Sequence, residues 1–197
     1  MIKTLAFVVE AKDPSTRAHL QRTHDYACAL AEAVDPEQAA DEQLRYGFLL
    51  HDVGKVGIPE AVLNKPGPLD PDEWEVMRAH PLLGVQMVAG IKSLGSAVEV
   101  IRCHHERWDG KGYPNGLAGE AIPAGARVFS VADAFDAMTS DRPYRKAIPF
   151  DQACQKIADG TGSQVDPMVV DAFTTIVPDL HASLHTGAVD SLTHVVP

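Results

Sequence analysis

The sequence predicts an all-α fold, a compact bundle of roughly eight or nine helices. Apolar residues recur at a spacing of three or four along almost the whole chain, as on the buried face of a helix. No segment shows the period-two alternation and hairpin turns of a β-sheet. With 197 residues, 45% of them hydrophobic and 22% charged, the chain has the composition of one globular domain with its own core.

Eight helices can be placed individually from the apolar spacing. In order, they fall around residues 2–9, 15–35, 36–52, 74–79, 80–88, 128–138, 150–157 and 169–177. Prolines set several of their limits, at Pro14, Pro36 and Pro81, because proline suits the first turn of a helix but not its interior. The clearest amphipathic stripe is that of residues 128–138. Residues 181–197 lose the helical spacing, which predicts a domain over residues 1–180 followed by a loosely packed C-terminal tail.

Two connections are too long and too rich in glycine and proline to be plain linkers. Residues 54–71 and 109–125 each follow a predicted helix end that carries histidine. Ordered loops of this length usually carry function. We therefore expect a functional site where these two loops meet the helix ends.

Charge and cysteine content restrict the partners and the compartment. The formal charge is −10, from 27 acidic and 17 basic residues, which disfavours a nucleic-acid polymer or an anionic membrane as a partner. No apolar stretch reaches membrane-spanning length. The three cysteines, Cys28, Cys103 and Cys154, are odd in number and widely spaced, which is typical of free thiols in a reducing compartment. These features predict a cytoplasmic protein.

Histidine and aspartate residues are grouped in a way that indicates a metal centre. Neighbouring residues of a helix diverge by roughly 100°, so a His-Asp pair can reach different sides of one pocket. With His19, His51 and Asp133 on one side and His80, His104 and His105 on the other, a bridging Asp52 could join two metal ions. The alternative is a helical bundle with incidental histidines.

The donor set also indicates the metal and the substrate class. Imidazole-rich ligation without thiolate suits iron or manganese, and also zinc or nickel, but disfavours calcium. Two divalent ions and two aspartates leave a net positive site inside an acidic protein. Such a site suits a phosphodiester substrate and in-line attack by a metal-bound hydroxide.

Several segments together resemble a known family. They are HDVGKVGIP at residues 51–59, NKPG at 64–67, HHERWDGKGYP at 104–114, ADAFD at 132–136 and SDRPYR at 140–145. In these segments the chain resembles the HD-GYP subgroup of the HD-domain phosphohydrolases, over about residues 10–177.

The resemblance implies a helical HD fold with a Gly/Pro-rich GYP loop, a centre of two or three metals, and hydrolysis of cyclic di-GMP to pGpG or on to GMP. It places the metal ligands at His19, His51, Asp52, His80, His104, His105 and Asp133. It gives Asp52 and Lys55 catalytic roles, with Lys55 expected to touch the substrate phosphate or the metal-bound water. Gly112, Tyr113 and Pro114 would shape the substrate pocket and meet a partner such as a diguanylate cyclase.

One position departs from the family pattern. Members with a third metal carry a glutamate one helical turn before the first histidine ligand, and here that place is Ser15, which is a poor ligand. We therefore expect two ions, although Glu10 and Asp13 lie nearby in the sequence.

Further side chains have two alternative roles each. Arg142 and Arg145 either bind a substrate phosphate or form a solvated cluster. Tyr113 and Trp108 either stack on guanine or anchor the loop. Glu106 is expected to orient an imidazole from behind.

Three functions remain open from the sequence. The leading hypothesis is a cyclic di-GMP phosphodiesterase. The second is a non-catalytic cyclic dinucleotide-binding or protein-interaction module. The third keeps the enzyme but changes its substrate to another cyclic dinucleotide, such as cyclic GMP-AMP.

Overall fold

The computed structural model describes residues 17–141 and 146–185 of the chain. The helix predicted at residues 2–9 lies outside the described residues, as do Glu10, Asp13, Ser15, Arg142 and Arg145. The predicted all-α class is confirmed, because the described residues form helices and no strand beyond two isolated bridges.

The helices follow one another without an intervening sheet. Their bounds are α2 (Arg17–Val34), α3 (Pro36–Ala39), α4 (Glu42–Leu50), the 3-10 helix η1 (Val53–Gly57), α5 (Glu60–Leu63), α6 (Pro71–Arg78), α7 (His80–Val88), α8 (Gly95–Cys103), the 3-10 helix η2 (Gly119–Ala121), α9 (Ala124–Thr139), α10 (Phe150–Asp159) and α11 (Pro167–His185).

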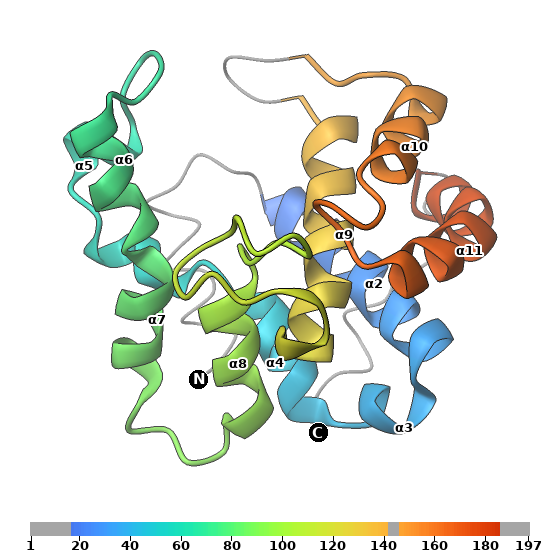
Figure 1. Ribbon diagram of the computed structural model, residues 1–197, viewed down its shortest axis with the longest axis horizontal. Coiled ribbons are helices and arrows are strands. Elements are labelled where there is room, and N and C mark those ends of the chain that lie inside the picture. Colours follow the sequence, from blue (N-terminus) through green and yellow to red (C-terminus); the bar gives the residue numbers. More distant parts are fainter. Residues whose placement is uncertain (1–16, 142–145, 186–197) are drawn as a thin grey trace.

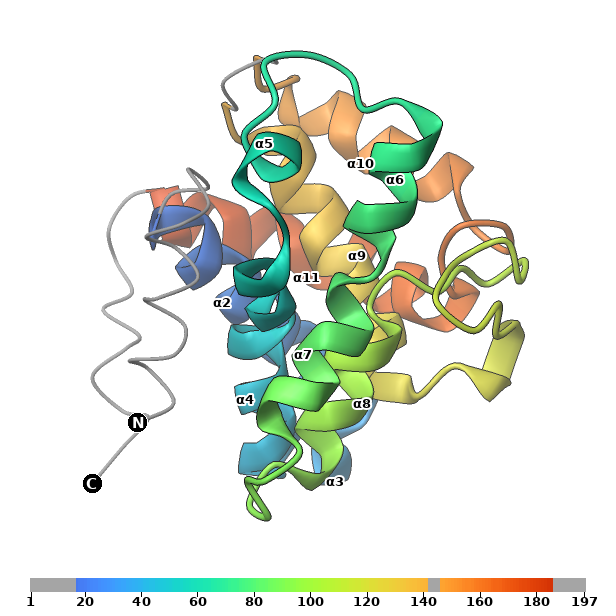
Figure 2. The same cartoon turned by 90° about the vertical axis from the view of Figure 1, so that its left-hand side faces the viewer.

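Two hydrophobic clusters organise the bundle. The larger one joins α2, α4, α9, α10 and α11 around Phe48, Phe129 and Phe135. The smaller one joins α4, η1, α7 and α8 around Leu50 and Ile101. In Figure 1, α10 and α11 lie on one side of α9 and the α5–α8 segment lies on the other. Figure 2 shows α4, α7 and α8 running together on a single face. Helix α4 belongs to both clusters and so connects the two halves.

Three local features differ from the predicted elements. The predicted helix 36–52 is two helices ending at Leu50, because the extended backbone of Asp41 interrupts it and the Asp41 carboxylate accepts the Gln43 amide at 2.9 Å. The 54–71 connection contains η1 and α5 rather than continuous loop. Helix α8 is a further helix that lies outside the eight ranges predicted from the apolar spacing.

The predicted start of the C-terminal tail also differs from the structure. Helix α11 continues past residue 181 to His185. The His181 ring packs against Phe150 with the ring centroids 4.7 Å apart, and its Nδ1 lies 2.7 Å from the Tyr26 hydroxyl. These contacts with the larger cluster explain why the helix extends beyond the last strongly apolar turn. Within the described residues, no helix is both long and apolar enough to cross a bilayer.

A close backbone approach fixes η1 against α7. A Cβ atom added at Gly54 would lie 1.8 Å from the His80 carbonyl oxygen and 2.5 Å from the Gly84 amide nitrogen. Backbone atoms cannot yield as the end of a flexible side chain can. Only glycine therefore allows the segment after Asp52 to pack directly on the helix that begins with His80.

We expect Gly54→Ala to lower the free energy of unfolding by on the order of 3 kcal/mol, because it overpacks a backbone–backbone contact. Chemical denaturation measures this change. Gly90→Ala is the matched control, since a Cβ at Gly90 meets nothing within 4 Å. Equal stability of the two variants would contradict the packing described for Gly54.

Candidate metal centre

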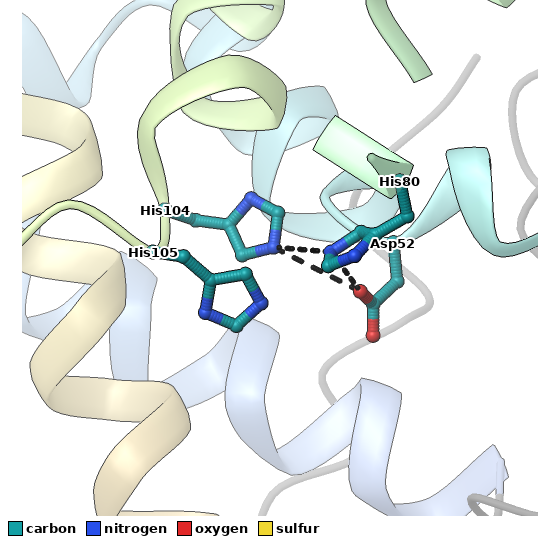
Figure 3. A group of neighbouring side chains, drawn as sticks. All are labelled: Asp52, His80, His104 and His105. Atoms are coloured by element: carbon teal, nitrogen blue, oxygen red, sulfur yellow. Dashed lines mark hydrogen bonds and ion pairs between the residues drawn. The ribbon is translucent and has the colours of Figure 1, made fainter. Parts of the chain in front are cut away.

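Helix ends bring the predicted ligands to one place. His51 and Asp52 follow α4, His80 begins α7, and His104 and His105 follow α8. His19 lies on α2 and Asp133 on α9. The tightest group consists of Asp52, His80, His104 and His105, whose ligand atoms all lie within 4.8 Å of one another (Figure 3).

Backbone carbonyls orient three of the imidazole rings in the same way. In each ring Nδ1 lies within hydrogen-bond distance of a carbonyl oxygen one turn earlier, and the pairs are His51 with Phe48 at 2.9 Å, His80 with Met77 at 2.8 Å and His104 with Ile101 at 3.0 Å. A carbonyl oxygen can only accept, so Nδ1 carries the proton in each neutral ring. The Nε2 lone pair of each ring is then directed into the site and is available to a metal.

The resulting arrangement of lone pairs fits a cation. His80 Nε2 and His104 Nε2 lie 3.2 Å apart, and Asp52 Oδ1 lies 3.2 Å from the first and 3.8 Å from the second (Figure 3). Two nitrogen lone pairs and a carboxylate oxygen at this separation repel one another unless a positive charge is shared among them. The donor chemistry of these residues therefore matches a divalent transition metal.

Titration behaviour supports the same conclusion. Burial and the neighbouring His105 and His51 hold the pKa of His104 well below its usual range, and burial with His80 lowers the pKa of His105 to about 4. Although burial alone would raise the pKa of Asp52, the Lys55 ammonium and His51 hold it well below its usual range. Near neutral pH His104 and His105 are therefore uncharged and Asp52 is ionised, the protonation states that metal binding requires.

The other predicted ligands border a hollow next to this group. The hollow, called here the metal hollow, has a volume of about 340 Å³ and is lined by His19, His51, Asp52, Lys55, His105, Asp133 and Ala137. His51 Nε2 lies 3.1 Å from Asp52 Oδ2, and His19 Nε2 lies 3.7 Å from Asp133 Oδ1. Lys55 Nζ lies 2.8 Å from Asp52 Oδ2. The structure thus brings all seven predicted ligands and Lys55 together.

Asp136 is a further candidate for a role at this site, beyond the residues predicted from the sequence. Its fully buried carboxylate contacts His19 Nδ1 and accepts hydrogen bonds from Arg22, with Nε at 2.6 Å. Asp136 therefore orients His19 as the backbone carbonyls orient the other rings, with Arg22 balancing its charge. The available signal was its position three residues after Asp133, which puts both carboxylates on one face of α9.

The role expected for Glu106 is wrong. Its carboxylate is buried but contacts no imidazole: Oε1 accepts the Asn115 amide at 2.7 Å and Oε2 accepts the Leu117 amide at 3.0 Å. Glu106 thus holds the GYP loop by two main-chain N–H groups. The loop folds back onto the helix end in a way that sequence spacing alone does not indicate.

The GYP loop reaches the site through Gly112 and Tyr113. A Cβ at Gly112 would lie 2.4 Å from the Arg107 amide nitrogen, so glycine is required for this approach. The Tyr113 ring stacks on His105 with the centroids 4.7 Å apart. Both residues line a second hollow of about 360 Å³, and Pro114 and Trp108 are not among its lining residues. Trp108 instead lies under the Arg127 guanidinium, 5.9 Å from the ring centroid, which favours the anchoring role.

Comparison with known proteins identifies the family. The family model of the HD domain matches residues 3–169. The chain belongs to the HD domain family. The HHERWDGKGYP segment and the curated relatives place it in the HD-GYP group of that family. The predicted resemblance is thereby confirmed.

Curated relatives of this HD domain are longer proteins. A Vibrio cholerae protein named cyclic di-GMP phosphodiesterase is 44% identical over 190 residues, covering 89% of this chain and 39% of that protein. A Thermotoga maritima protein of the same name is 35% identical over 182 residues, covering 91% of this chain and 50% of the relative. The chain therefore spans half or less of the length of these relatives.

Solved structures show the same fold. A cyclic GMP-AMP-specific phosphodiesterase of Vibrio cholerae superposes with a TM-score of 0.71 at 19% identity, covering 93% of this chain and 50% of the other. An HD-GYP-type protein of Bdellovibrio bacteriovorus gives a TM-score of 0.64 at 26% identity, covering 81% and 51%. These similarities agree with the helical HD architecture.

We expect Asp52→Ala to remove most of the bound metal, because the two oxygens of this carboxylate face the imidazoles of His51 and His80. Lys55→Ala should keep the metal, since an ammonium group is not a ligand. Elemental analysis of anaerobically purified protein measures both. Equal metal loss in the two variants would contradict the roles assigned.

We expect Glu106→Gln to loosen the GYP loop, because a charge-assisted hydrogen bond contributes about 1.5–3 kcal/mol and one acceptor oxygen is lost. Hydrogen–deuterium exchange of the peptide containing residues 112–117 should become faster. Glu120→Gln, at an exposed position of η2, is the control. Unchanged exchange in Glu106→Gln would show that other contacts hold the loop.

Proposed function

We propose that this chain hydrolyses a phosphodiester bond of cyclic di-GMP to give pGpG and/or GMP, using two divalent metal ions. One observation carries the proposal: the Asp52 carboxylate faces imidazoles with both of its oxygens. Oδ1 lies 3.2 Å from His80 Nε2, and Oδ2 lies 3.1 Å from His51 Nε2. A carboxylate held in this way suits a bridge between two metal sites of the kind used in phosphoester hydrolysis.

The proposed ligand sets follow from this bridge. His80, His104 and His105 with Asp52 would hold one ion, and His19, His51 and Asp133 with Asp52 would hold the other. The imidazole-rich donor set favours iron or manganese. When bound, such ions supply Lewis acidity, neutralising phosphoryl charge and lowering the pKa of water. Two ions rather than three are proposed because Ser15 stands where a third ion would need a carboxylate.

Lys55 is the proposed phosphate-binding residue of the metal hollow. Its ammonium group is oriented by Asp52 at 2.8 Å, and its side chain is only 17% exposed. A cation in this position attracts the substrate phosphate and stabilises the charge that develops on its oxygens. Asp52 is catalytic in the same proposal because its carboxylate belongs to both proposed ligand sets and also contacts the Lys55 ammonium group.

The names of the relatives support a cyclic dinucleotide as substrate. Besides the cyclic di-GMP phosphodiesterases, a Vibrio cholerae protein named 3'3'-cGAMP-specific phosphodiesterase 2 is 36% identical over 173 residues. Cyclic GMP-AMP is therefore the second candidate substrate. Both substrates present the same scissile bond to the metal centre, so they differ only in the base that the pocket accepts.

The remaining parts of the proposal rest on the sequence. Arg142 and Arg145 would bind a substrate phosphate, and the GYP loop of Gly112, Tyr113 and Pro114 would meet a protein partner such as a diguanylate cyclase. The loop is fixed to the site by Glu106 and Tyr113, while Asn115 is exposed. A reducing, cytoplasmic location is consistent with the three free cysteines.

With manganese or ferrous iron under anaerobic conditions, we expect the purified protein to convert cyclic di-GMP to pGpG or GMP, measured by chromatography. Lys55→Ala should lower turnover by on the order of a hundredfold, as loss of one charge-stabilising donor does in other enzymes. Cyclic GMP-AMP is assayed in parallel to decide between the substrates. Binding of cyclic di-GMP without product would contradict the hydrolase and support a binding module.

A further inference from the structure

Two hollows share one wall formed by His105 and Asp133. The metal hollow lies on one side of this wall, and the second hollow, of about 360 Å³, lies on the other. A substrate at the metal centre therefore has a second space directly beside it. The chemistry of that space is different, because three cationic side chains line it: Arg78, Arg107 and Lys111.

The carboxylates near these cations face other partners, and Asp133 Oδ1, in the shared wall, lies 3.7 Å from His19 Nε2. Glu106 lines the second hollow, but its two oxygens accept the Asn115 and Leu117 amides of the GYP loop. Arg107 is paired with Asp109 through two hydrogen bonds of 3.0 and 2.9 Å. For Arg78, in contrast, no carboxylate among the described residues lies within ion-pair distance. Lys111 lacks such a partner as well, so Arg78 and Lys111 are the two cations of this hollow without a carboxylate within ion-pair distance among the described residues.

Aromatic rings hold Arg78 in place. Its guanidinium lies 5.8 Å from the Trp74 ring centroid and 5.6 Å from that of Tyr113. Tyr113 in turn stacks on the ligand His105. Contacts of this kind orient a guanidinium while leaving its N–H groups free to donate. The Tyr113 ring therefore lies between the exposed Arg78 guanidinium and His105.

The proposed substrate has a group that matches this arrangement. A cyclic dinucleotide carries two phosphates, and only one of them can occupy the metal centre at a time. The other must lie to one side, where a guanidinium binds phosphate oxygens as a forked donor. We propose that Arg78 binds this second phosphate in the second hollow and so selects a diphosphate ring over a simple phosphodiester. The inference rests on the proposed function.

The test compares two substrates. Cyclic di-GMP carries the second phosphate, whereas bis(p-nitrophenyl) phosphate has one phosphodiester and no second phosphate. For Arg78→Gln we expect the KM for cyclic di-GMP to rise about ten- to a hundredfold, the effect of losing one charge-assisted contact. Hydrolysis of bis(p-nitrophenyl) phosphate should be unchanged. Arg78→Lys should retain part of the affinity, because the charge remains.

The matched control is Arg102→Gln, which removes the same charge from an exposed position of α8 outside both hollows. Arg102→Gln should behave as the unmodified protein with both substrates. An unchanged KM in Arg78→Gln would overturn the proposal, as would an equal loss with both substrates, which would mean that Arg78 only supports Tyr113 and His105.

A second readout separates this inference from the proposed hydrolysis. The inhibition constant of cyclic di-GMP against hydrolysis of bis(p-nitrophenyl) phosphate reports binding even where the dinucleotide is not cleaved. It should rise in Arg78→Gln by the same factor as KM. Failure of the unmodified protein to cleave either substrate would contradict the proposed function, whereas an unchanged inhibition constant would contradict the role of Arg78 alone.

Discussion

The carboxylate of Asp52 is the group on which the rest of the site depends. It contacts imidazoles on both sides and the Lys55 ammonium, and its position is set by backbone rather than by flexible side chains. Asp52 directly follows α4, a helix that contributes to both hydrophobic clusters, and Gly54 then packs on the backbone of α7. A carboxylate placed where two cores meet is held by both of them, so a small shift between the two halves would displace Asp52 relative to the imidazoles around it.

The groups that contact the imidazole rings determine which ring nitrogen faces the Asp52 carboxylate. Carbonyl oxygens one turn earlier hold the rings of His51, His80 and His104, while Asp136 holds that of His19. Helix ends are suited to this purpose because their last carbonyls have no partner within the helix. The same unsatisfied groups that would destabilise a helix end are used here to orient imidazoles. These contacts therefore fix both the position of each imidazole ring and the ring nitrogen that carries its proton.

Local sequence signals indicated the residues that the structure brings together, whereas long-range contacts could not be predicted in the same way. The His51-Asp52 and His104-His105 pairs are adjacent in the chain, so their chemistry is visible without a structure. The role of Glu106 could not be predicted because its partners are main-chain amides nine and eleven residues further along the chain, and no side-chain pattern marks them. The break at Asp41 was overlooked because the apolar spacing continues across it, although the aspartate cap itself is a local signal. Arg78 was overlooked because its relation to Tyr113 exists only after α6 and the GYP loop have packed together.

The way in which Glu106 holds the GYP loop has a consequence for sequence variation. It binds the loop only through the N–H groups of residues 115 and 117, which every amino acid except proline possesses. The side chain at position 115 points into solvent and contributes nothing to that anchor. Related chains can therefore change the outward surface of this loop freely while its inner surface, with Tyr113 against His105, stays in register with the metal centre. The exposed surface of the loop can vary while the residues at the site stay the same, because the buried Glu106 carboxylate holds the loop by its main chain.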